Sequence, residues 1–246
     1  MCDPSDLTRF ATQVLEAVGT PHKGALDMAT QIVASDLAGH ESHGIRRLRE
    51  YANRTLDGWV DPAAQPIYEI DMGSLVRING NRAYGHILMT EVTDLLIERS
   101  RQHGIAAIAV HNVDPAGRFA DFCDRAADNG IATLMYMNVS GEAKTVAPPG
   151  GLEARISTNP IAAGVPRAGG PNIVYDMATS SVAKGRLSDA NERNTEISSE
   201  WVTREGHLTP FGGAKGFAIA IITEALAGSL TGAGTVGHDE VEYRQG

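Results

Sequence analysis

The stretch IAAIAVHNVDPAGRFADFCDRAADNGIATLMYMNV, residues 105–139, indicates the class of the fold. It contains two apolar, β-branched segments, residues 105–110 and 131–139, which have the composition of buried strands. Residues 118–130, between them, are predicted to form a helix. A strand, a helix and a second strand in this order build a mostly parallel sheet with helical crossovers, so we expect an α/β fold.

The segments that precede this stretch are predicted to be mostly helical, because their apolar residues recur at helical spacing and a glycine follows at the expected end of the helices. Helices are predicted for two segments within residues 5–38 and for residues 45–56 and 86–104. Two strands, residues 67–71 and 75–80, are predicted around a short turn. The N-terminal quarter of the chain is therefore expected to be helical.

The segments that follow the stretch continue the alternation of strands and helices. Residues 154–166 and 172–180 are strand candidates, and residues 215–232 are predicted to form a strongly apolar helix. Residues 186–206 are polar and aperiodic, which is typical of a surface segment. The sequence contains neither an internal repeat nor a low-complexity tract.

Composition excludes several classes of partner. The chain has 246 residues, 42% of them hydrophobic, so it can bury a sizeable core. Its formal net charge of -9 and the lack of a basic run argue against nucleic acid. No stretch approaches the roughly 20 apolar residues that a membrane span needs, and the first residues do not resemble a leader. Cys2 and Cys123 are too far apart for a disulfide framework or thiolate metal site, so a cytoplasmic protein is expected.

His43 is the first candidate for chemistry, within GHESHGIRRLREY, residues 39–51. Three interpretations remain open. The imidazole can satisfy a backbone group at a helix start, or form half a metal site with His40, although no third cluster of ligands completes that site. It can also act as a general acid and base, because its unperturbed pKa suits proton transfer near neutrality.

Arg46 is placed one helical turn beyond His43 and is expected on the same helix face. Its planar guanidinium could bind a carboxylate, and a histidine with an arginine is typical of a 2-oxo acid site. The alternative is a solvated surface charge, which is the interpretation we give to Arg47 and Arg49.

Two further segments have the composition of ligand sites. Asp176 stands near the end of a predicted strand, where it could cap a helix or recognise ligand hydroxyl groups, and both interpretations remain open. Gly212, Gly213 and Lys215 directly precede the apolar helix, so backbone N–H groups and a lysine could converge on an anion. The spacing is not that of a Walker motif, and no G-x-G-x-x-G follows a predicted strand.

Taken together, five segments in this order make the chain resemble the malate/L-lactate dehydrogenase family, which includes L-sulfolactate and ureidoglycolate dehydrogenases and 2,3-diketogulonate reductase. The segments are DLAGHESHGIRRL (36–48), NVSGEAKTVAPPGG (138–151), ISTNPIAAGVPR (156–167), VYDMATSSVAKG (174–185) and LTPFGGAKGFAIAIITEALAGSLTGAG (208–234). The resemblance covers essentially the whole chain.

The resemblance implies a fold and an activity. The fold would be α/β, with a non-Rossmann, mixed-sheet nicotinamide-binding domain at residues 81–232 and a helix-rich second domain for substrate binding and dimerisation. Residues 1–80 would begin that second domain, completed by residues 233–246 and a C-terminal part that relatives have. The activity would be NAD- or NADP-dependent hydride transfer to or from a small 2-hydroxy or 2-oxo acid of the malate or lactate type, in a homodimer without a metal.

The resemblance also assigns roles to residues. His43 would be the proton donor and acceptor, with Ser42 and Arg46 beside it, and Gly44 would let the substrate approach closely. Hydride transfer leaves negative charge on the carbonyl oxygen, so a proton and a cation are needed there. The expected cofactor contacts are Ser140, Asp176, Met177, Ala178, Thr179, Gly213, Lys215 and Gly216.

Two departures from the family pattern keep a rival interpretation open. Many relatives have a histidine in an Asn-x-x-His-x-Gly-Arg loop, where NVDPAGR, residues 112–118, has Pro115. Either His43 handles the proton alone or Asp114 takes part of that role. The chain also lacks the longer C-terminal part of its relatives and has a shorter connection near Gly206. The rival is a catalytically impaired paralogue that acts as a ligand-binding or regulatory protein.

Overall fold

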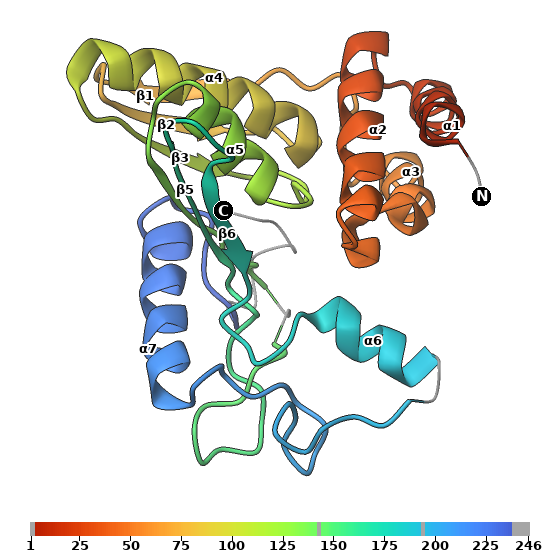
Figure 1. Ribbon diagram of the computed structural model, residues 1–246, viewed down its shortest axis with the longest axis vertical. Coiled ribbons are helices and arrows are strands. Elements are labelled where there is room, and N and C mark those ends of the chain that lie inside the picture. The colour runs from red at the N-terminus through yellow and green to blue at the C-terminus, as the bar shows by residue number, and fades with distance from the viewer. Residues whose placement is uncertain (1–2, 142–143, 193–194, 238–246) are drawn as a thin grey trace.

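The computed structural model describes residues 3–141, 144–192 and 195–237 (Figure 1). Three helices at the N-terminal side stand beside two small sheets. The helices are α1 (Pro4–Ala17), α2 (His22–Leu37), α3 (Leu48–Leu56), α4 (Gly85–His103), α5 (Ala120–Asp128), α6 (Lys184–Glu192) and α7 (Ala214–Thr223). Two short 3-10 helices, η1 (Glu41–His43) and η2 (Ile45–Arg47), precede α3, and the π-helix η3 (Glu224–Ser229) continues α7.

The N-terminal helices α1, α2 and α3 pack through part of the apolar residues that recur at helical spacing, since Phe10, Leu37 and Leu56 of those stripes are exposed. Asp3 caps α1 by accepting a hydrogen bond from Ser5 N at 2.7 Å, and Pro4 occupies the first helical position. The core residues of this unit are Ala11, Leu15, Ala25, Met28, Ala29, Ile32, Leu48, Tyr51, Val60 and Tyr84. The expected helical N-terminal quarter is confirmed, although residues 45–47 begin as a 3-10 turn.

The first sheet has the order β1-β2-β3, with strands Ile67–Asp71, Leu75–Asn79 and Ala107–His111. β1 runs antiparallel to β2, whereas β2 and β3 run parallel and are connected through α4. Val76, Ile78 and Val110 pack with Leu88 and Val92 of α4. The domain boundary expected near residue 80 falls between β2 and β3, which belong to one sheet.

The second sheet has the order β4-β5-β6, with strands Thr133–Tyr136, Ile161–Val165 and Ile173–Met177, and all its pairs are antiparallel. The expectation of a mostly parallel sheet is therefore wrong, since β2 and β3 are the parallel pair among the described strands. The physical reason is that β4 pairs with β5, which follows it along the chain, and belongs to a different sheet from β3. The broader expectation of a mixed α/β fold is confirmed.

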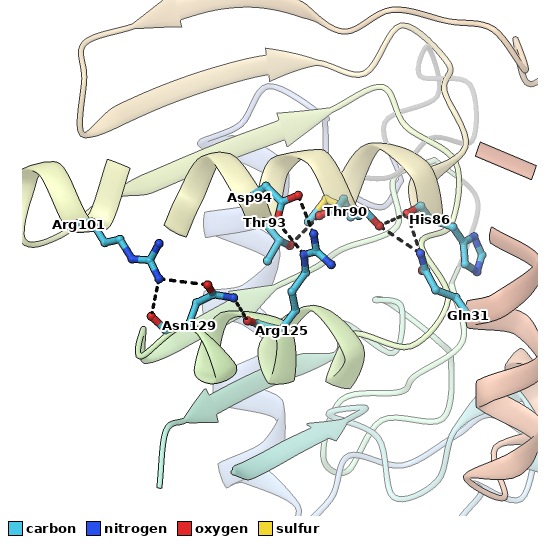
Figure 2. Close-up of polar contacts among 9 residues, drawn as sticks. Gln31, His86, Thr90, Thr93, Asp94, Arg101, Arg125 and Asn129 are labelled. Carbon is cyan, nitrogen blue, oxygen red and sulfur yellow. Dashed lines mark hydrogen bonds and ion pairs between the residues drawn. The ribbon is translucent and has the colours of Figure 1, made fainter. Parts of the chain in front are cut away.

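Polar contacts join α4 to its neighbours (Figure 2). Arg125 of α5 forms two 2.7 Å bonds to the Asp94 carboxylate of α4. Arg101 donates to the backbone and side-chain oxygens of Asn129, at 3.1 Å each. Gln31 of α2 reaches the His86 carbonyl oxygen, at 3.3 Å. These bonds hold α4 between the N-terminal helices and α5.

Two sequence-based expectations for the C-terminal half need correction. Residues 186–206 were expected to form an aperiodic surface segment, but α6 occupies Lys184–Glu192. The helix lacks a strong apolar stripe, and it is anchored instead by Leu187 against the core and by Arg186, 5.0 Å from the Trp201 ring centroid. The apolar helix predicted for residues 215–232 changes to π geometry at Glu224. None of the helices within the described ranges is long and apolar enough to cross a membrane.

Gly164 of β5 allows α5 to pack directly on the second sheet, because a Cβ there would lie 2.5 Å from the Cys123 carbonyl oxygen. We predict that Gly164→Ala lowers the free energy of unfolding by about 1–3 kcal/mol, since backbone atoms must move to make room. Urea denaturation measures the change. Ala163→Ser, at the adjacent half-buried position of β5, is the matched control. Equal urea midpoints for Gly164→Ala and the parent protein would contradict this packing.

Candidate active site

The turn that carries His43 is shaped by the carboxylate of Asp36, near the end of α2. Asp36 Oδ2 accepts a hydrogen bond from Ile45 N at 2.7 Å. The same carboxylate lies so close to Gly44 that a Cβ at this position would overlap it. Gly44 has an extended backbone, with φ -89° and ψ -159°, which other residues also adopt. The close approach of Asp36 therefore requires glycine at this position, independently of the substrate approach expected for Gly44.

Gly44 also separates His43 from Arg46, which corrects the expected geometry. The sequence analysis placed both residues on one face of a continuous helix, but η1 ends at His43 and η2 begins at Ile45. Because the helix is interrupted at Gly44, the three-residue spacing does not place Arg46 on the same helix face as His43. Arg46 is exposed, whereas Arg47 is half-buried, with its guanidinium carbon 5.8 Å from the Tyr51 ring centroid. Arg47 is therefore a partly exposed charge that pairs with Glu50 at 2.9 Å and packs on Tyr51, whereas a fully solvated charge was expected.

His43 lies between the N-terminal helices and the loop before α5. Its Nδ1 and Ser42 Oγ are 3.0 Å apart, within hydrogen-bond distance. Gly185 allows the first turn of α6 to approach this pair, since a Cβ there would lie 2.6 Å from Ser42 Cβ. The positive charges that act on His43 are those of Arg47, His40 and Arg118. The structure thus gathers an imidazole, a hydroxyl and several cationic groups from three separate segments.

Burial is the main influence on the protonation of His43. It lowers the pKa of the imidazole to about 4, and the nearby Arg47, His40 and Arg118 lower it further in the same direction. His43 is therefore neutral at neutral pH, which is the form that can accept a proton. An anion bound beside it would act in the opposite direction and favour the imidazolium.

His86, in the first turn of α4, is a second histidine of this region that the sequence analysis missed. It is 2% exposed, and its ring packs edge-on against Tyr51, with the centroids 5.1 Å apart. Gly117 makes room for it, because a Cβ at Gly117 would overlap His86 Nε2. Burial lowers the pKa of His86 to about 3, and His43 and Arg47 act in the same direction. No local sequence pattern distinguishes His86 from an ordinary helix residue.

Asp114 precedes Pro115 in the loop where many relatives of the suspected family have a histidine. Its side chain is buried, and Arg54 Nε donates to Asp114 Oδ1 at 2.6 Å. Burial raises the pKa of Asp114 to about 6, although Arg54 opposes this shift. The carboxylate is thus committed to an ion pair with α3. This pairing connects the loop to the N-terminal helices.

Asp176 holds the N-terminus of α5. Its Oδ2 accepts hydrogen bonds from Phe119 N at 2.6 Å and Ala120 N at 3.0 Å. The capping interpretation therefore describes what its carboxylate does in this structure, although the capped helix comes from an earlier part of the chain. Burial raises the pKa of Asp176, while these two bonds, His40 and Arg118 lower it. The bond to Phe119 N, directly after Arg118, links Asp176 to the surroundings of His43.

The other expected cofactor residues lie at ends of the second sheet and at the start of α7. Ser140 and Thr179 are buried, and Thr179 donates from N and Oγ1 to Thr158 O at 2.9 and 2.8 Å. Met177 is exposed and Ala178 half-buried. Gly213 and Lys215 are exposed at the start of α7, whose N-terminus has no side-chain cap, and Gly216 is buried against Phe211. An uncapped helix N-terminus with a lysine is suited to bind an anion.

A metal site at His40 and His43 would need a third ligand. Within the described ranges, no group of three or more His, Cys, Asp or Glu side chains could hold a metal ion. Cys123 is a buried free thiol, and its burial raises its pKa to about 11. Cys2 lies outside the described residues. Acid–base chemistry at His43 is the function that this arrangement supports best.

Comparisons with known proteins agree on one family. The sequence model of the family described as malate/L-lactate dehydrogenase matches residues 2–246. An L-lactate dehydrogenase of Cupriavidus necator is 34% identical over 250 residues, which cover 94% of this chain and 71% of that protein. An L-sulfolactate dehydrogenase of Methanothermobacter thermautotrophicus is 30% identical, covering 94% and 70%. The solved Δ1-piperideine-2-carboxylate reductase of Pseudomonas syringae superposes with a TM-score of 0.85 at 26% identity, covering 99% and 80%.

The contact between Asp36 and Gly44 can be tested with a double-mutant cycle. We predict that Gly44→Ala alone lowers the free energy of unfolding by about 1–3 kcal/mol, because the new methyl group displaces the carboxylate from Ile45 N. Asp36→Ala removes the obstacle, so the double variant should be more stable than the sum of the single effects predicts. Urea denaturation of the four proteins measures this coupling. Strictly additive effects would show that the two residues are not in contact.

The buried histidines predict how stability depends on pH. The pKa values of His43 and His86, about 4 and about 3, lie below the unfolded value of 6.5, so the unfolded chain binds more protons as the pH falls. Their stabilising effect is therefore fully present above pH 6.5 and is lost toward pH 4, by up to about 1.4 kcal/mol per pH unit for each histidine. Asp114, with its raised pKa, opposes this trend below about pH 6.

We predict that replacing one of these histidines weakens the pH dependence. His86→Gln should lose less stability than the parent protein between pH 7 and pH 5, because glutamine does not titrate. The measurement is the urea midpoint at pH 7, 6 and 5 for both proteins. His103→Gln, at an exposed position near the end of α4, controls for losing a histidine. An identical pH dependence in the His86→Gln variant would mean that His86 is not held neutral.

Proposed function

Because the chain belongs to the malate/L-lactate dehydrogenase family, we propose that it is an NAD(P)-dependent oxidoreductase of small 2-hydroxy and 2-oxo acids. The named relatives are dehydrogenases of lactate, sulfolactate and malate, which supports an oxidoreductase acting on hydroxy acids. Malate and lactate, which the names of relatives give as substrates, are the first substrates that we propose to test. The observation that carries the proposal is the half-buried His43, whose pKa is lowered, with a hydroxyl on one ring nitrogen and arginines nearby.

The tautomer of His43 determines how it can act. When Nδ1–H donates to Ser42 Oγ, Nε2 has a free lone pair and can take the proton of a substrate hydroxyl. The nicotinamide, when bound, supplies or accepts the hydride. His43 therefore acts as the base in hydroxy acid oxidation and as the acid in 2-oxo acid reduction. Its low pKa keeps the imidazole in the neutral form that the first role needs, but it also makes the imidazole a weaker base.

The cationic groups around His43 support the second role. A 2-oxo acid carries a carboxylate, which Arg46, Arg47 and Arg118 can bind. Arg47, which also pairs with Glu50, and Arg118, which also pairs with Asp121, lower the pKa of His43, and a bound carboxylate would offset their charge. Substrate binding thus favours the protonated imidazole when a proton must be given to the carbonyl oxygen. The same arginines orient the acid through its carboxylate.

The residues of the second sheet and α7 fit a nicotinamide nucleotide. Exposed glycines and Lys215 at the uncapped start of α7 suit its phosphates, and an open space surrounds the positions of Gly212 and Gly213. The proposed contacts are Ser140, Asp176, Met177, Ala178, Thr179, Gly213, Lys215 and Gly216. Since the Asp176 carboxylate bonds to α5, it would contact the nucleotide through its remaining lone pairs. NAD and NADP both remain candidates.

The proposal extends to organisation and surroundings. Residues 1–80 would provide the substrate side of the site, and residues 81–232 would provide the cofactor side. The substrate side would be completed by residues 233–246, of which 238–246 lie outside the described residues, and by the C-terminal part that relatives have. We propose a cytoplasmic homodimer with a small-molecule acid as partner and neither a nucleic acid nor a membrane. These points follow the family and the acidic composition.

A second candidate function is ligand binding without turnover. It is favoured by one observation: the loop that ends at Arg118 has Pro115 and a carboxylate, Asp114, that is occupied by Arg54. A protein of this kind would bind the nucleotide or the acid and leave both unchanged. The two candidates differ in whether nicotinamide oxidation depends on an added acid.

The experiment that tests the proposal is a turnover assay with NADH or NADPH and a panel of pyruvate, oxaloacetate, sulfopyruvate and cyclic imino acids. The proposal predicts nucleotide oxidation that requires one of these acids. Nucleotide binding without turnover of any acid would favour the binding protein, and the absence of both would refute the proposal.

His43→Ala isolates the proton transfer. We predict that it lowers kcat by roughly 10²- to 10⁴-fold, because general acid–base catalysis contributes about this factor. Nucleotide affinity, measured by fluorescence titration, should stay within a few-fold of the parent value. His103→Ala removes an exposed histidine far along α4 and should leave both quantities unchanged. A variant that loses nucleotide affinity but keeps its rate at saturation would contradict the assigned role.

A further inference from the structure

Glu224 is a buried carboxylate that the proposed reaction does not use. It opens the π-helix η3 and is 8% exposed. Its Oε2 accepts from Asn159 Nδ2 at 2.6 Å, and its Oε1 accepts from Val236 N at 2.7 Å and, over a longer distance of 3.4 Å, from Asn138 Nδ2. Both oxygens are therefore engaged, and the donors come from three different segments. Short π-helical turns of this kind are frequent at functional sites.

The two asparagines depend on this carboxylate for their orientation. Asn138 and Asn159 are fully buried, and each donates through Nδ2 to one backbone carbonyl in addition to Glu224, namely Gly234 O at 2.9 Å and Ala220 O at 3.1 Å. Their Oδ1 atoms have no partner among the described residues. Each amide is thus held only from its donor side, which makes Glu224 a shared anchor of both.

The segments held by Glu224 are those expected to contact the nucleotide. Ser140 follows Asn138 by two residues. Thr179 donates twice to the carbonyl oxygen of Thr158, the neighbour of Asn159. One carboxylate therefore lies at the junction of the segment after β4 and the segment before β5, and through Thr158 it is connected to the end of β6.

Close packing at this junction leaves little freedom. A Cβ at Gly228 would lie 2.5 Å from Asn138 Nδ2 and 2.6 Å from Gly234 O, so η3 approaches both segments directly. Gly141 pairs with Val236 in a parallel bridge, and Gly237 N donates to Gly141 O at 2.9 Å. The bond from Val236 N to Glu224 completes a link between residues 138–141 and 234–237.

We propose that Glu224 is a positioning residue that fixes the spacing of the two nucleotide-binding segments, residues 138–141 and the Thr158–Thr179 pair, and fastens residues 234–237 to the first of them. The identity of the ligand rests on the proposed function. The carboxylate itself does not touch the ligand in this account. It acts through Asn138, Asn159 and Val236.

The chemistry of the junction requires a carboxylate. All three partners present N–H groups, so both oxygens must accept. Glutamine has the same shape but offers one oxygen and one NH2 group, which sets a donor against a donor on one side. Aspartate keeps the charge but is one methylene shorter, so it cannot reach both sides. Glu224→Gln and Glu224→Asp therefore break the link in two independent ways.

The test compares these variants with Glu91→Gln, which removes the same charge from an exposed position of α4. Amide hydrogen exchange, measured without any nucleotide, should accelerate roughly tenfold or more in residues 138–141 and 234–237 of both Glu224 variants, about the effect of losing one hydrogen bond to a charged group. Exchange in α1, α2 and α3 should stay unchanged. Unchanged exchange in the two segments, or an equal acceleration throughout the chain, would overturn the proposal.

A second readout connects the link to ligand binding. The KM for NADH or NADPH should rise roughly tenfold or more in both Glu224 variants, while kcat at saturating nucleotide stays within a few-fold, because the reacting groups at His43 are untouched. A fall in kcat alone would overturn the positioning role. If the parent protein bound no nucleotide, the proposed function would fail, and the exchange experiment would still decide whether Glu224 links these segments.

Discussion

The approach of the Asp36 carboxylate to Gly44 is the constraint on which the candidate site depends. The carboxylate holds Ile45 N and leaves no room for a side chain at Gly44, the residue that separates the short 3-10 turn of His43 from the next one. A side chain at Gly44 would occupy the space of the carboxylate, so neither residue can change alone. The histidine is thereby fixed on backbone that is anchored at both ends, as a catalytic group requires.

The rest of the site is assembled by contacts between distant segments. Gly185 lets α6 reach Ser42, Gly117 accommodates His86, and the Asp176 carboxylate caps α5 directly after Arg118. These contacts join η1 to α6, the loop before α5 to α4, and the second sheet to the start of α5. Because burial keeps His43 neutral and arginines surround it, the site is prepared for an anionic acid whose arrival changes the proton affinity of the imidazole.

Much of this could be predicted from the sequence, because hydrophobic periodicity placed the helices α1, α2 and α4 and the apolar runs placed the strands. The pairing of β4 with β5 could not, since alternation along the chain does not specify which strands are neighbours. The spacing of His43 and Arg46 also suggested that they share a helix face, because the contact between Asp36 and Gly44 leaves no local signal. His86 and Glu224 were missed for the same reason: their partners are far away in the sequence.

The central claim is that His43 exchanges a proton with the oxygen of a hydroxy or oxo acid that the arginines bind by its carboxylate. A crystal structure of the protein with a nicotinamide nucleotide and oxamate, an unreactive analogue of a 2-oxo acid, tests it most directly. We expect the oxamate carbonyl oxygen within hydrogen-bond distance of His43 Nε2, and the oxamate carboxylate against Arg46, Arg47 or Arg118. Oxamate bound away from His43, with the imidazole still enclosed by protein, would contradict it.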